Sequence, residues 1–418
     1  MKPRVTLIPA LIGALALAAS ACAPAEEQAA EFTPGPLGAV TVRPDQPIKV
    51  GAIQVISGAD ASLGEDQQRA LRVAMDDKGG KLFGHDLELE VEDAQCLAEG
   101  GTTAAQKLAA DPQIVGVVGT SCSGAAVPAM GILADKGISM ISGSNTSPSL
   151  TSNLRGKKGA DNHKGYFRTA HNDVIQGQAA ATFALERLKA KRAVTIHDGD
   201  PYTEGLANAF GAAFKEQGGK VALATAVDKS ATDMRPILTE VAAKKPDLVF
   251  FPIFQPAADF IVRQAKEFPE LRNAEKLMGA DGLLSDTFVV IKATEGMYFS
   301  GPATPTGSPY QEFVGKYEEK FGEKPIQSFH AHAYDAFNML HAAIRKTAVR
   351  EDDGTIQIDR KKLMDALYAT KNFEGLTGSL RCDKFGDCAD AKIDIVQNTQ
   401  EQEKISDVRG NVKFTHEP

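Results

Sequence analysis

Short apolar runs alternate along this chain with longer segments in which apolar residues recur every three or four positions. Residues 48–57 (IKVGAIQVIS) predict a strand, and residues 65–80 (EDQQRALRVAMDDKGG) predict a helix that ends at a glycine pair. Residues 87–93 (LELEVED) alternate as a strand does, and residues 100–111 (GGTTAAQKLAAD) predict a second helix. Strands that alternate with helices in this order predict a doubly wound α/β fold.

The segment 114–146 contains two short apolar runs that are separated by the length of a helix. Residues 114–119 (IVGVVG) and 138–142 (ISMIS) predict parallel strands of one βαβ unit, and small polar residues follow each run. In open α/β sheets ligands bind at the carboxyl ends of the strands, where the next helix offers backbone N–H groups. Ser123 and Thr146 are therefore candidates for binding a small anion such as a carboxylate. The alternative is that both residues only cap helices or turns.

A second alternating series begins after residues 147–173, a polar segment with no clear period. This restart predicts a second lobe of similar architecture. Its expected elements are a helix over 174–188, strands over 192–198, 220–227, 247–254 and 276–281, and helices after Pro201, Asp233 and Pro256. Further along, we expect a strand over 295–303, helices over 309–321, 328–349 and 359–370, and terminal strands around Cys382 and over 392–397.

The N-terminus has the pattern of a secretory signal peptide. Lys2 and Arg4 precede an apolar run that is too short to serve as a membrane anchor, and the run ends at residues 19–22 (ASAC). This ending resembles the lipobox of bacterial lipoproteins, in which the cysteine, here Cys22, becomes the lipidated first residue. The alternative is an ordinary signal peptide that is cut after an A-x-A site. Residues 23–47, rich in Ala, Glu, Pro and Gly, predict a disordered tether, and the whole chain is expected to be exported as a periplasmic or cell-surface protein.

The cysteines agree with export. Five cysteines are present, so assigning Cys22 to a lipid leaves an even number, which suggests two disulfides in an oxidising compartment. Proximity in sequence pairs Cys382 with Cys388, and elimination then pairs Cys96 with Cys122. A metal site is the rival interpretation, but the chain has no CxxC pair.

Charge and missing motifs exclude several classes of function. The net charge is −8 with no long run of like charges, which is unfavourable for nucleic-acid binding. The chain has no phosphate-binding loop, no dinucleotide fingerprint, no HExxH and no GxSxG motif, so neither a cofactor nor a metal is expected. His330 and His332 would face nearly opposite sides of a helix, which argues against a shared metal ion.

Several spaced phrases together give the chain a family resemblance. In order, IKVGAIQVISG, EDAQC, GTSCSGAAVPA, SGSNTSPSLT, FRTAHND, HDGDPYTEGLA, DLVFFPIFQPAADFIVRQA and LMGADGL resemble the leucine/isoleucine/valine-binding proteins, type I periplasmic binding proteins of bacterial ABC importers. The resemblance extends from about residue 48 to 390. It implies two flavodoxin-like (Rossmann-like) α/β lobes with parallel sheets, which close like a hinge on a ligand between them.

The resemblance also implies how the chain divides. Three crossovers are expected near residues 169–173, 300–303 and 378–382. Lobe 1 would comprise residues 48–170 and 302–379, and lobe 2 residues 171–301 and 380–418. The disulfide of the family's first lobe corresponds to Cys96 with Cys122, in agreement with the elimination above.

From lobe 1, the resemblance assigns three residues to the ligand's charged groups. Ser123 and Thr146 would bind the α-carboxylate, and the backbone carbonyl of Ser144 would help to hold the ammonium group. Leu63 stands where the family often has an aromatic residue over the side-chain pocket. An insertion over residues 153–165 would lie at the rim of the cleft.

From lobe 2, the resemblance assigns Tyr202, Phe254 and Asp281 to the site. A buried ammonium group needs a carboxylate partner, since an unpaired charge in a closed cleft is costly, and Asp281 would be that partner. Asp281 could instead be a turn residue. Phe254 replaces a tyrosine of the family and Asp281 a glutamate, which suits a differently placed or bulkier ligand. The expected ligand is an amino acid, branched-chain or related, with leucine itself less favoured.

The expected function is therefore that of an extracytoplasmic solute-binding protein. Its partners would be a small-molecule ligand and the permease and ATPase of an ABC importer, with membrane contact only through the lipid anchor and no catalysis. One alternative is a ligand-sensing receptor of the same fold for amides, urea or carboxylates. Another is an exported hydrolase that uses Ser123 with His171 or His197, although no triad order supports it.

Overall fold

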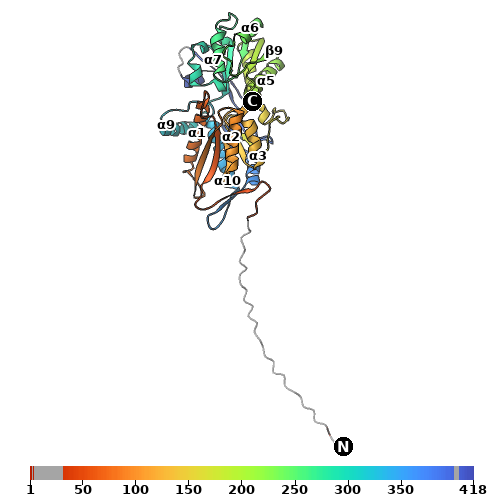
Figure 1. Cartoon of the computed structure of the whole chain (residues 1–418), viewed down its shortest axis with the longest axis vertical. Coiled ribbons are helices and arrows are strands. Elements are labelled where there is room, and N and C mark those ends of the chain that lie inside the picture. Colours follow the sequence, from red (N-terminus) through yellow and green to blue (C-terminus); the bar gives the residue numbers. More distant parts are fainter. Residues whose placement is uncertain (2, 4–31, 400–403) are drawn as a thin grey trace. The chain divides into compact units, whose positions relative to one another are not determined.

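Two mainly parallel sheets organise the chain in the computed structural model, which describes residues 1, 3, 32–399 and 404–418. Residues 34–418 belong to one unit, in which helices α1, α2, α3 and α10 gather in one part and α5, α6 and α7 in the other (Figure 1). The predicted α/β fold with parallel sheets is thereby confirmed. Apart from residues 1 and 3, the predicted signal peptide lies outside the described residues, as does Cys22.

The first sheet has six strands in the order β3-β4-β2-β5-β6-β7, and all neighbours except β3 and β4 run parallel. We call this sheet and its helices lobe 1. One face packs against α2 and α3 and the other against α1 and α10. The elements are β2 (Ile48–Gln54), β3 (Lys81–Leu82), β4 (His85–Asp93), β5 (Ile114–Gly119), β6 (Ser139–Ser142), β7 (Tyr166–Arg168), α1 (Ala61–Asp76), α2 (Ala98–Ala110), α3 (Ser123–Asp135), η1 (Pro148–Leu150), α9 (Ser308–Phe321), α10 (His330–Thr347) and α11 (Arg360–Tyr368).

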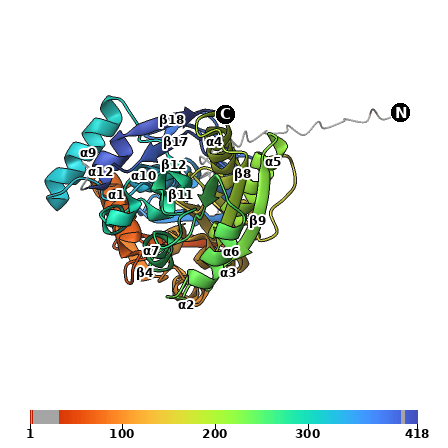
Figure 2. The same ribbon diagram turned by 90° about the horizontal axis from the view of Figure 1, so that it is seen from above.

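The second sheet has seven strands in the order β18-β17-β12-β11-β10-β8-β9, of which β17 and β18 are antiparallel to their neighbours (Figure 2). We call this sheet and its helices lobe 2. Helices α4 and α5 pack on one face and α6, α7, α8 and α12 on the other. The elements are α4 (Asp173–Glu186), β8 (Arg192–His197), α5 (Pro201–Glu216), β9 (Lys220–Ala226), α6 (Arg235–Ala243), β10 (Leu248–Phe250), α7 (Ala257–Ala265), η2 (Ala274–Lys276), β11 (Leu277–Ala280), η3 (Asp281–Leu283), α8 (Asp286–Val289), η4 (Lys292–Thr294), β12 (Tyr298–Pro302), β17 (Ile393–Gln397), α12 (Ile405–Gly410) and β18 (Val412–His416).

Strand β1 (Ala39–Val42) lies in the segment that the sequence predicts to be a disordered tether. It pairs antiparallel with β14 (Ile356–Asp359), which also pairs with β13 (Val349–Arg350), so these strands form a small separate sheet. Val40 and Val42 are buried in the core of lobe 1. The prediction that residues 23–47 are a disordered tether is therefore wrong over residues 39–42, because two alternating valines bury one side of this segment.

The chain passes between the lobes three times: between β7 and α4, between β12 and α9, and between β16 (Gly378–Leu380) and β17. Strand β16 forms a two-stranded ribbon with β15 (Phe373–Gly375). Disulfides join Cys96 to Cys122 and Cys382 to Cys388, the pairs expected from the sequence. No helix in the described part of the chain combines the length and the apolar character that crossing a bilayer requires.

Candidate ligand-binding site

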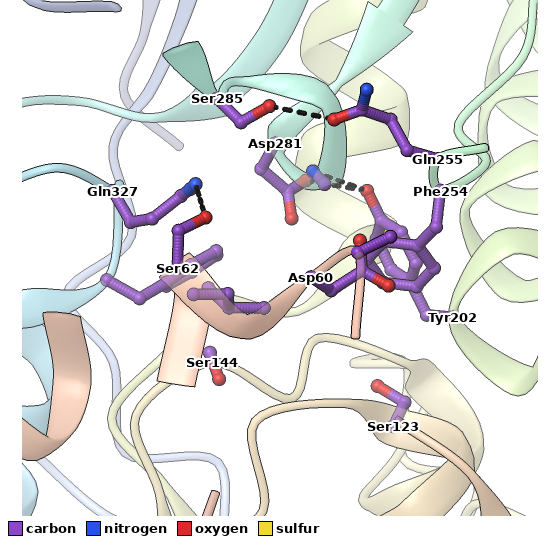
Figure 3. A pocket seen from close by; sticks show the side chains of 14 residues that line it. Asp60, Ser62, Ser123, Ser144, Tyr202, Phe254, Gln255, Asp281, Ser285 and Gln327 are labelled. Atoms are coloured by element: carbon purple, nitrogen blue, oxygen red, sulfur yellow. Dashed lines mark hydrogen bonds between the residues drawn. The ribbon is translucent and has the colours of Figure 1, made fainter. Parts of the chain in front are cut away.

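A cavity lies where the carboxyl ends of strands from both sheets face each other (Figure 3). All the predicted ligand-binding residues except Thr146 line it, namely Leu63, Ser123, Ser144, Tyr202, Phe254 and Asp281. Its free volume is about 20 Å³, which is room for roughly one water molecule. A ligand of amino-acid size therefore enters only if the lobes separate or side chains move.

Ser123 is the first residue of α3 and follows strand β5 directly after the disulfide-bonded Cys122. Its side chain is buried, and its Oγ accepts a hydrogen bond from the Ser147 N–H at 3.3 Å. The hydroxyl hydrogen can therefore be donated to a ligand at the positive end of the helix. The disulfide fixes this position by joining it to Cys96 in the loop after β4.

Ser144 and Thr146 follow strand β6 and play different structural parts. The Ser144 hydroxyl donates to the Ser121 carbonyl at 2.8 Å and is also 3.1 Å from Gln67 Oε1, so its side chain is engaged within lobe 1. Thr146 is fully buried behind the cavity wall. Its hydroxyl is close enough to the carboxyl of Asp173 to favour the ionised form, although the geometry falls short of a hydrogen bond.

Asp281 follows strand β11 and begins the short helix η3. Its Oδ1 accepts hydrogen bonds from Gln176 Nε2 at 2.6 Å and from the Tyr202 hydroxyl at 3.1 Å. Burial raises the pKa of this carboxyl to about 6, while these two hydrogen bonds lower it. At pH 7 most of the carboxyl is therefore ionised and can bind a cationic group.

Tyr202 and Phe254 form an aromatic wall on the lobe 2 side. Their ring centroids are 5.1 Å apart, and the Tyr202 hydroxyl also accepts a hydrogen bond from the Gly282 N–H at 3.2 Å. Tyr202 is the second residue of α5, and its backbone N–H donates to the capping side chain of Asp200 at 2.9 Å. Burial raises the pKa of Tyr202 well above its ordinary value, so its hydroxyl remains a donor at neutral pH.

Sequence reasoning missed several polar residues on the cavity wall: Asp60, Ser62, Gln255, Ser285 and Gln327. Most of them follow strands β2, β10 or β11, so the rule that selected Ser123 could have found them. Gln327 instead precedes α10, where no strand signal exists. Burial and the neighbouring carboxyls of Asp198 and Asp200 raise the pKa of Asp60 to about 7.

Asp173, the first residue of α4, was also missed as part of the site's surroundings. It is fully buried, and burial together with the like charge of Asp281 raises its pKa well above the ordinary value, while Arg168 lowers it. Arg168 also donates to the Asn145 and Ser147 carbonyls at 3.1 and 2.8 Å. The loop that carries Thr146 is thereby held against the first crossover.

Three of the four histidines considered from the sequence, His171, His197 and His330, have other hydrogen-bond partners, whereas the Nδ1 of His332 is buried without one. His330 Nδ1 is 3.0 Å from Asp66 Oδ2 and its Nε2 is 2.8 Å from the Tyr310 hydroxyl. His171 Nε2 bonds to Gln176, and His197 Nδ1 accepts from the Gly199 N–H at 3.2 Å. Within residues 32–399 and 404–418, no three His, Cys, Asp or Glu side chains are arranged to hold a metal ion.

The insertion over residues 153–165 does not line the cavity. Its Arg155 forms an exposed ion pair with Glu216 of α5 at 2.9 Å, so it reaches lobe 2 beside the crossover instead of covering the ligand. An exposed pair of this kind contributes little to stability, about 0–1 kcal/mol.

The chain is similar in sequence and fold to known binding proteins. A Leu/Ile/Val-binding protein of Rhizobium johnstonii is 29% identical over 347 residues, which cover 81% of this chain and 90% of that protein. An isoleucine complex of a branched-chain amino acid transporter substrate-binding protein from Streptococcus pneumoniae has 23% identity and a TM-score of 0.72, covering 89% of this chain and 99% of that one.

A second solved structure has the same fold with a different kind of ligand. It is a solute-binding protein of an ABC transporter from R. palustris in complex with benzoate, with 22% identity, a TM-score of 0.67 and coverage of 85% of this chain and 94% of that one. The sequence model described as "Periplasmic binding protein" matches residues 47–397 of this chain. The chain therefore belongs to the periplasmic binding protein family.

Proposed function

We propose that this protein is the extracytoplasmic solute-binding component of an ABC importer and that it captures an amino acid between its lobes. The observation that carries this proposal is the buried carboxyl of Asp281 on the cavity wall opposite Ser123. An ammonium group would neutralise the carboxylate of lobe 2, and a carboxylate would meet the hydroxyl and the helix end of lobe 1. The α-groups of an amino acid provide both charges.

The cavity wall suits an amino acid whose side chain combines an apolar part with a hydrogen-bonding group. Besides the two charge anchors, the polar side chains of Asp60, Ser62, Ser285 and Gln327 line the space together with the apolar side chains of Leu63, Phe254 and Phe329. Gln327 Nε2 donates to Ser62 Oγ at 2.9 Å, and its side-chain Oε1, which has no donor among the described residues, can accept from a ligand. Leucine-type ligands, as in the relatives, are the alternative.

The proposal includes export and anchoring of the chain through Cys22, with a permease and an ATPase as partners. It includes no covalent step, and the hydrogen bonds of the nearby histidines support this. His171 pairs with Gln176 and His197 with Gly199, so neither is engaged with Ser123 as a general base would be. A sensory role for amides, urea or carboxylates is the second candidate. The benzoate complex of the solute-binding protein from R. palustris shows that the fold can hold a carboxylate that has no ammonium group.

A thermal-shift screen of the chain without residues 1–22 tests the proposal. The panel contains the L-amino acids, their D forms, simple amides, urea and benzoate, because a ligand that binds only the folded state raises the melting temperature. We expect L-amino acids to raise it, with polar side chains producing larger shifts than leucine. Shifts confined to ligands without an ammonium group would contradict the role of Asp281 and favour the sensor or an aromatic-acid carrier.

A further inference from the structure

Gln176 connects the ligand-facing carboxylate to two of the three crossovers. It lies in the first turn of α4, directly after the first crossover, and its side chain is fully buried. Its Nε2 donates to Asp281 Oδ1 at 2.6 Å and to Ser300 Oγ, on the strand before the second crossover, at 3.0 Å. Its Oε1 is hydrogen-bonded to His171 Nε2 in the first crossover.

The contact with His171 determines which way the amide of Gln176 points. An amide oxygen only accepts hydrogen bonds, so His171 must carry its proton on Nε2 and donate it. Burial lowers the pKa of His171 to about 4, which keeps the ring neutral with one N–H at physiological pH. With Oε1 held by His171, the NH₂ group of Gln176 is directed to Asp281.

We propose that Gln176 is a positioning residue that keeps Asp281 ionised in the ligand-free cleft, and that His171 fixes the orientation of its amide. This inference rests on the proposed function, in which Asp281 meets the ligand's ammonium group. Burial opposes ionisation of Asp281, and hydrogen bonds to the charged form favour it. Gln176 provides the shorter of the two side-chain hydrogen bonds, and Tyr202 provides the other.

The charged and titratable neighbours strengthen the need for such a donor. On α4, burial and the like charge of Asp281 raise the pKa of Asp173 well above its ordinary value, so this neighbour offers Asp281 no compensating positive charge. Arg168 on β7 is the nearby cation in the described part of the chain, and it acts on Asp173 and His171 and is bound to Asp387 at 2.6 Å. From α5, Tyr202 presents a neutral hydroxyl. Among the described residues, hydrogen-bond donors therefore compensate the charge of Asp281 before the ligand arrives.

If Gln176 had a purely structural role, its loss would affect the titration of Asp281 differently. If the amide only fills a buried polar position, its loss lowers the stability of the fold but leaves the ionisation of Asp281 unchanged. If the amide holds the carboxylate charged, its loss raises the pH at which Asp281 titrates. The titration of Asp281 in the ligand-free protein therefore separates the two roles without any ligand.

The test is carbon-13 NMR of aspartate-labelled protein, without residues 1–22, between pH 4 and pH 9. Asp281→Asn and Asp173→Asn identify the two coupled carboxyl signals. In Gln176→Leu we expect the titration midpoint of Asp281 to rise by about one pH unit or more, since a hydrogen bond to a charged group is typically worth about 1.5–3 kcal/mol. Gln264→Leu is the matched control, because Gln264 is a buried lobe 2 glutamine bonded to the Met234 N–H and the Thr232 carbonyl.

A midpoint that stays at the wild-type value in Gln176→Leu overturns the proposal. Should that variant fail to fold, His171→Phe keeps Gln176 and removes only the donor that orients it, and the midpoint is expected to rise by a smaller amount. An unchanged midpoint in His171→Phe, with Gln176→Leu shifted, would remove His171 from the proposal. Failure of L-amino acids in the ligand screen would instead count against the proposed function, since the NMR titration does not depend on a ligand.

Discussion

Lobe 1 presents the hydroxyl of Ser123 to the cavity, whereas lobe 2 presents the carboxyl of Asp281 and the rings of Tyr202 and Phe254. The edge of lobe 1 is fixed by a covalent bond between Cys96 and Cys122, and the edge of lobe 2 is held by hydrogen bonds to a buried charge. The two edges therefore differ in chemistry. Lobe 1 offers hydroxyl groups and, from Asp60, a carboxyl with a raised pKa, whereas lobe 2 offers a buried charge that gains a partner when a cationic group binds.

The largest expected effect comes from removing the charge of lobe 2. Burial raises the pKa of Asp281 from 3.8 in the unfolded chain to about 6 in the folded protein. The free energy of unfolding therefore falls as pH rises from about 4 to 6, and at pH 7 the whole of this destabilisation is present. In Asp281→Asn we expect affinity for an amino acid to fall roughly 100-fold or more. The melting temperature of the ligand-free variant should rise by about 2–5 °C.

Calorimetric titration and thermal unfolding at pH 7 measure both effects in the same samples. The wild-type protein at pH 5 is an internal control, because protonation of Asp281 should weaken binding there and stabilise the ligand-free fold. A variant that binds as tightly as the wild type would remove Asp281 from the charge-pairing role.

The second effect concerns the covalent bond of lobe 1. In the chain-entropy account, the disulfide that closes 26 residues contributes about 3.5 kcal/mol and the one that closes 6 residues about 2.2 kcal/mol. Cys96→Ser with Cys122→Ser should therefore lower the free energy of unfolding more than Cys382→Ser with Cys388→Ser. Denaturant titration of both double variants provides the comparison, and the opposite order would show that loop length does not decide it.

The third effect is the loss of the hydroxyl of lobe 1. In Ser123→Ala we expect about a tenfold loss of affinity, with the pH dependence of binding unchanged because the hydroxyl is neutral. Ser144→Ala is the matched control: its hydroxyl is engaged within lobe 1, so stability should fall by about 1 kcal/mol and affinity by less than about threefold. Equal losses of affinity in both variants would contradict the assignment of the carboxylate to Ser123.

The smallest effect is expected at the aromatic wall. Phe254→Tyr restores a hydroxyl beside Tyr202 without changing the ring, and Phe254 is only half-buried, so the new group can reach solvent. We expect affinity to change by less than about threefold in either direction, because the substitution adds at most one hydrogen bond to the ligand. A tenfold gain in a calorimetric titration would show that the ligand carries an acceptor at this position.

The sequence alone predicts the α/β fold and the position of the site. The apolar patterns mark the strands and helices, and ligands bind at the carboxyl ends of parallel strands. The apolar runs before Ser123 and after Asp135 form parallel strands β5 and β6, and Ser123 begins a helix at the cavity wall. Thr146 satisfies the same rule, but its side chain lies behind the wall beside Asp173. A strand end specifies an edge of the sheet and leaves open which way each side chain turns.

Other features depend on partners that are distant in the sequence. Strand β1 has only two buried valines and gains its order from β14, more than 300 residues later, so composition alone suggests a tether. Gln327 reaches the cavity from a segment before α10, with no strand to mark it. Gln176 has no signal at all, since a glutamine in the first turn of a helix is unremarkable until Asp281 and His171 are placed beside it.

The pairing of β1 with β14 also determines how the binding unit responds to mechanical load. Tension that reaches Pro34 enters lobe 1 through the small sheet of β1, β14 and β13, in which Ala39 pairs with Asp359 and Val42 with Ile356. The connections between β7 and α4, β12 and α9, and β16 and β17 lie outside this path. Pulling on the N-terminal side should therefore detach β1 first, while the lobes remain free to open and close around a ligand.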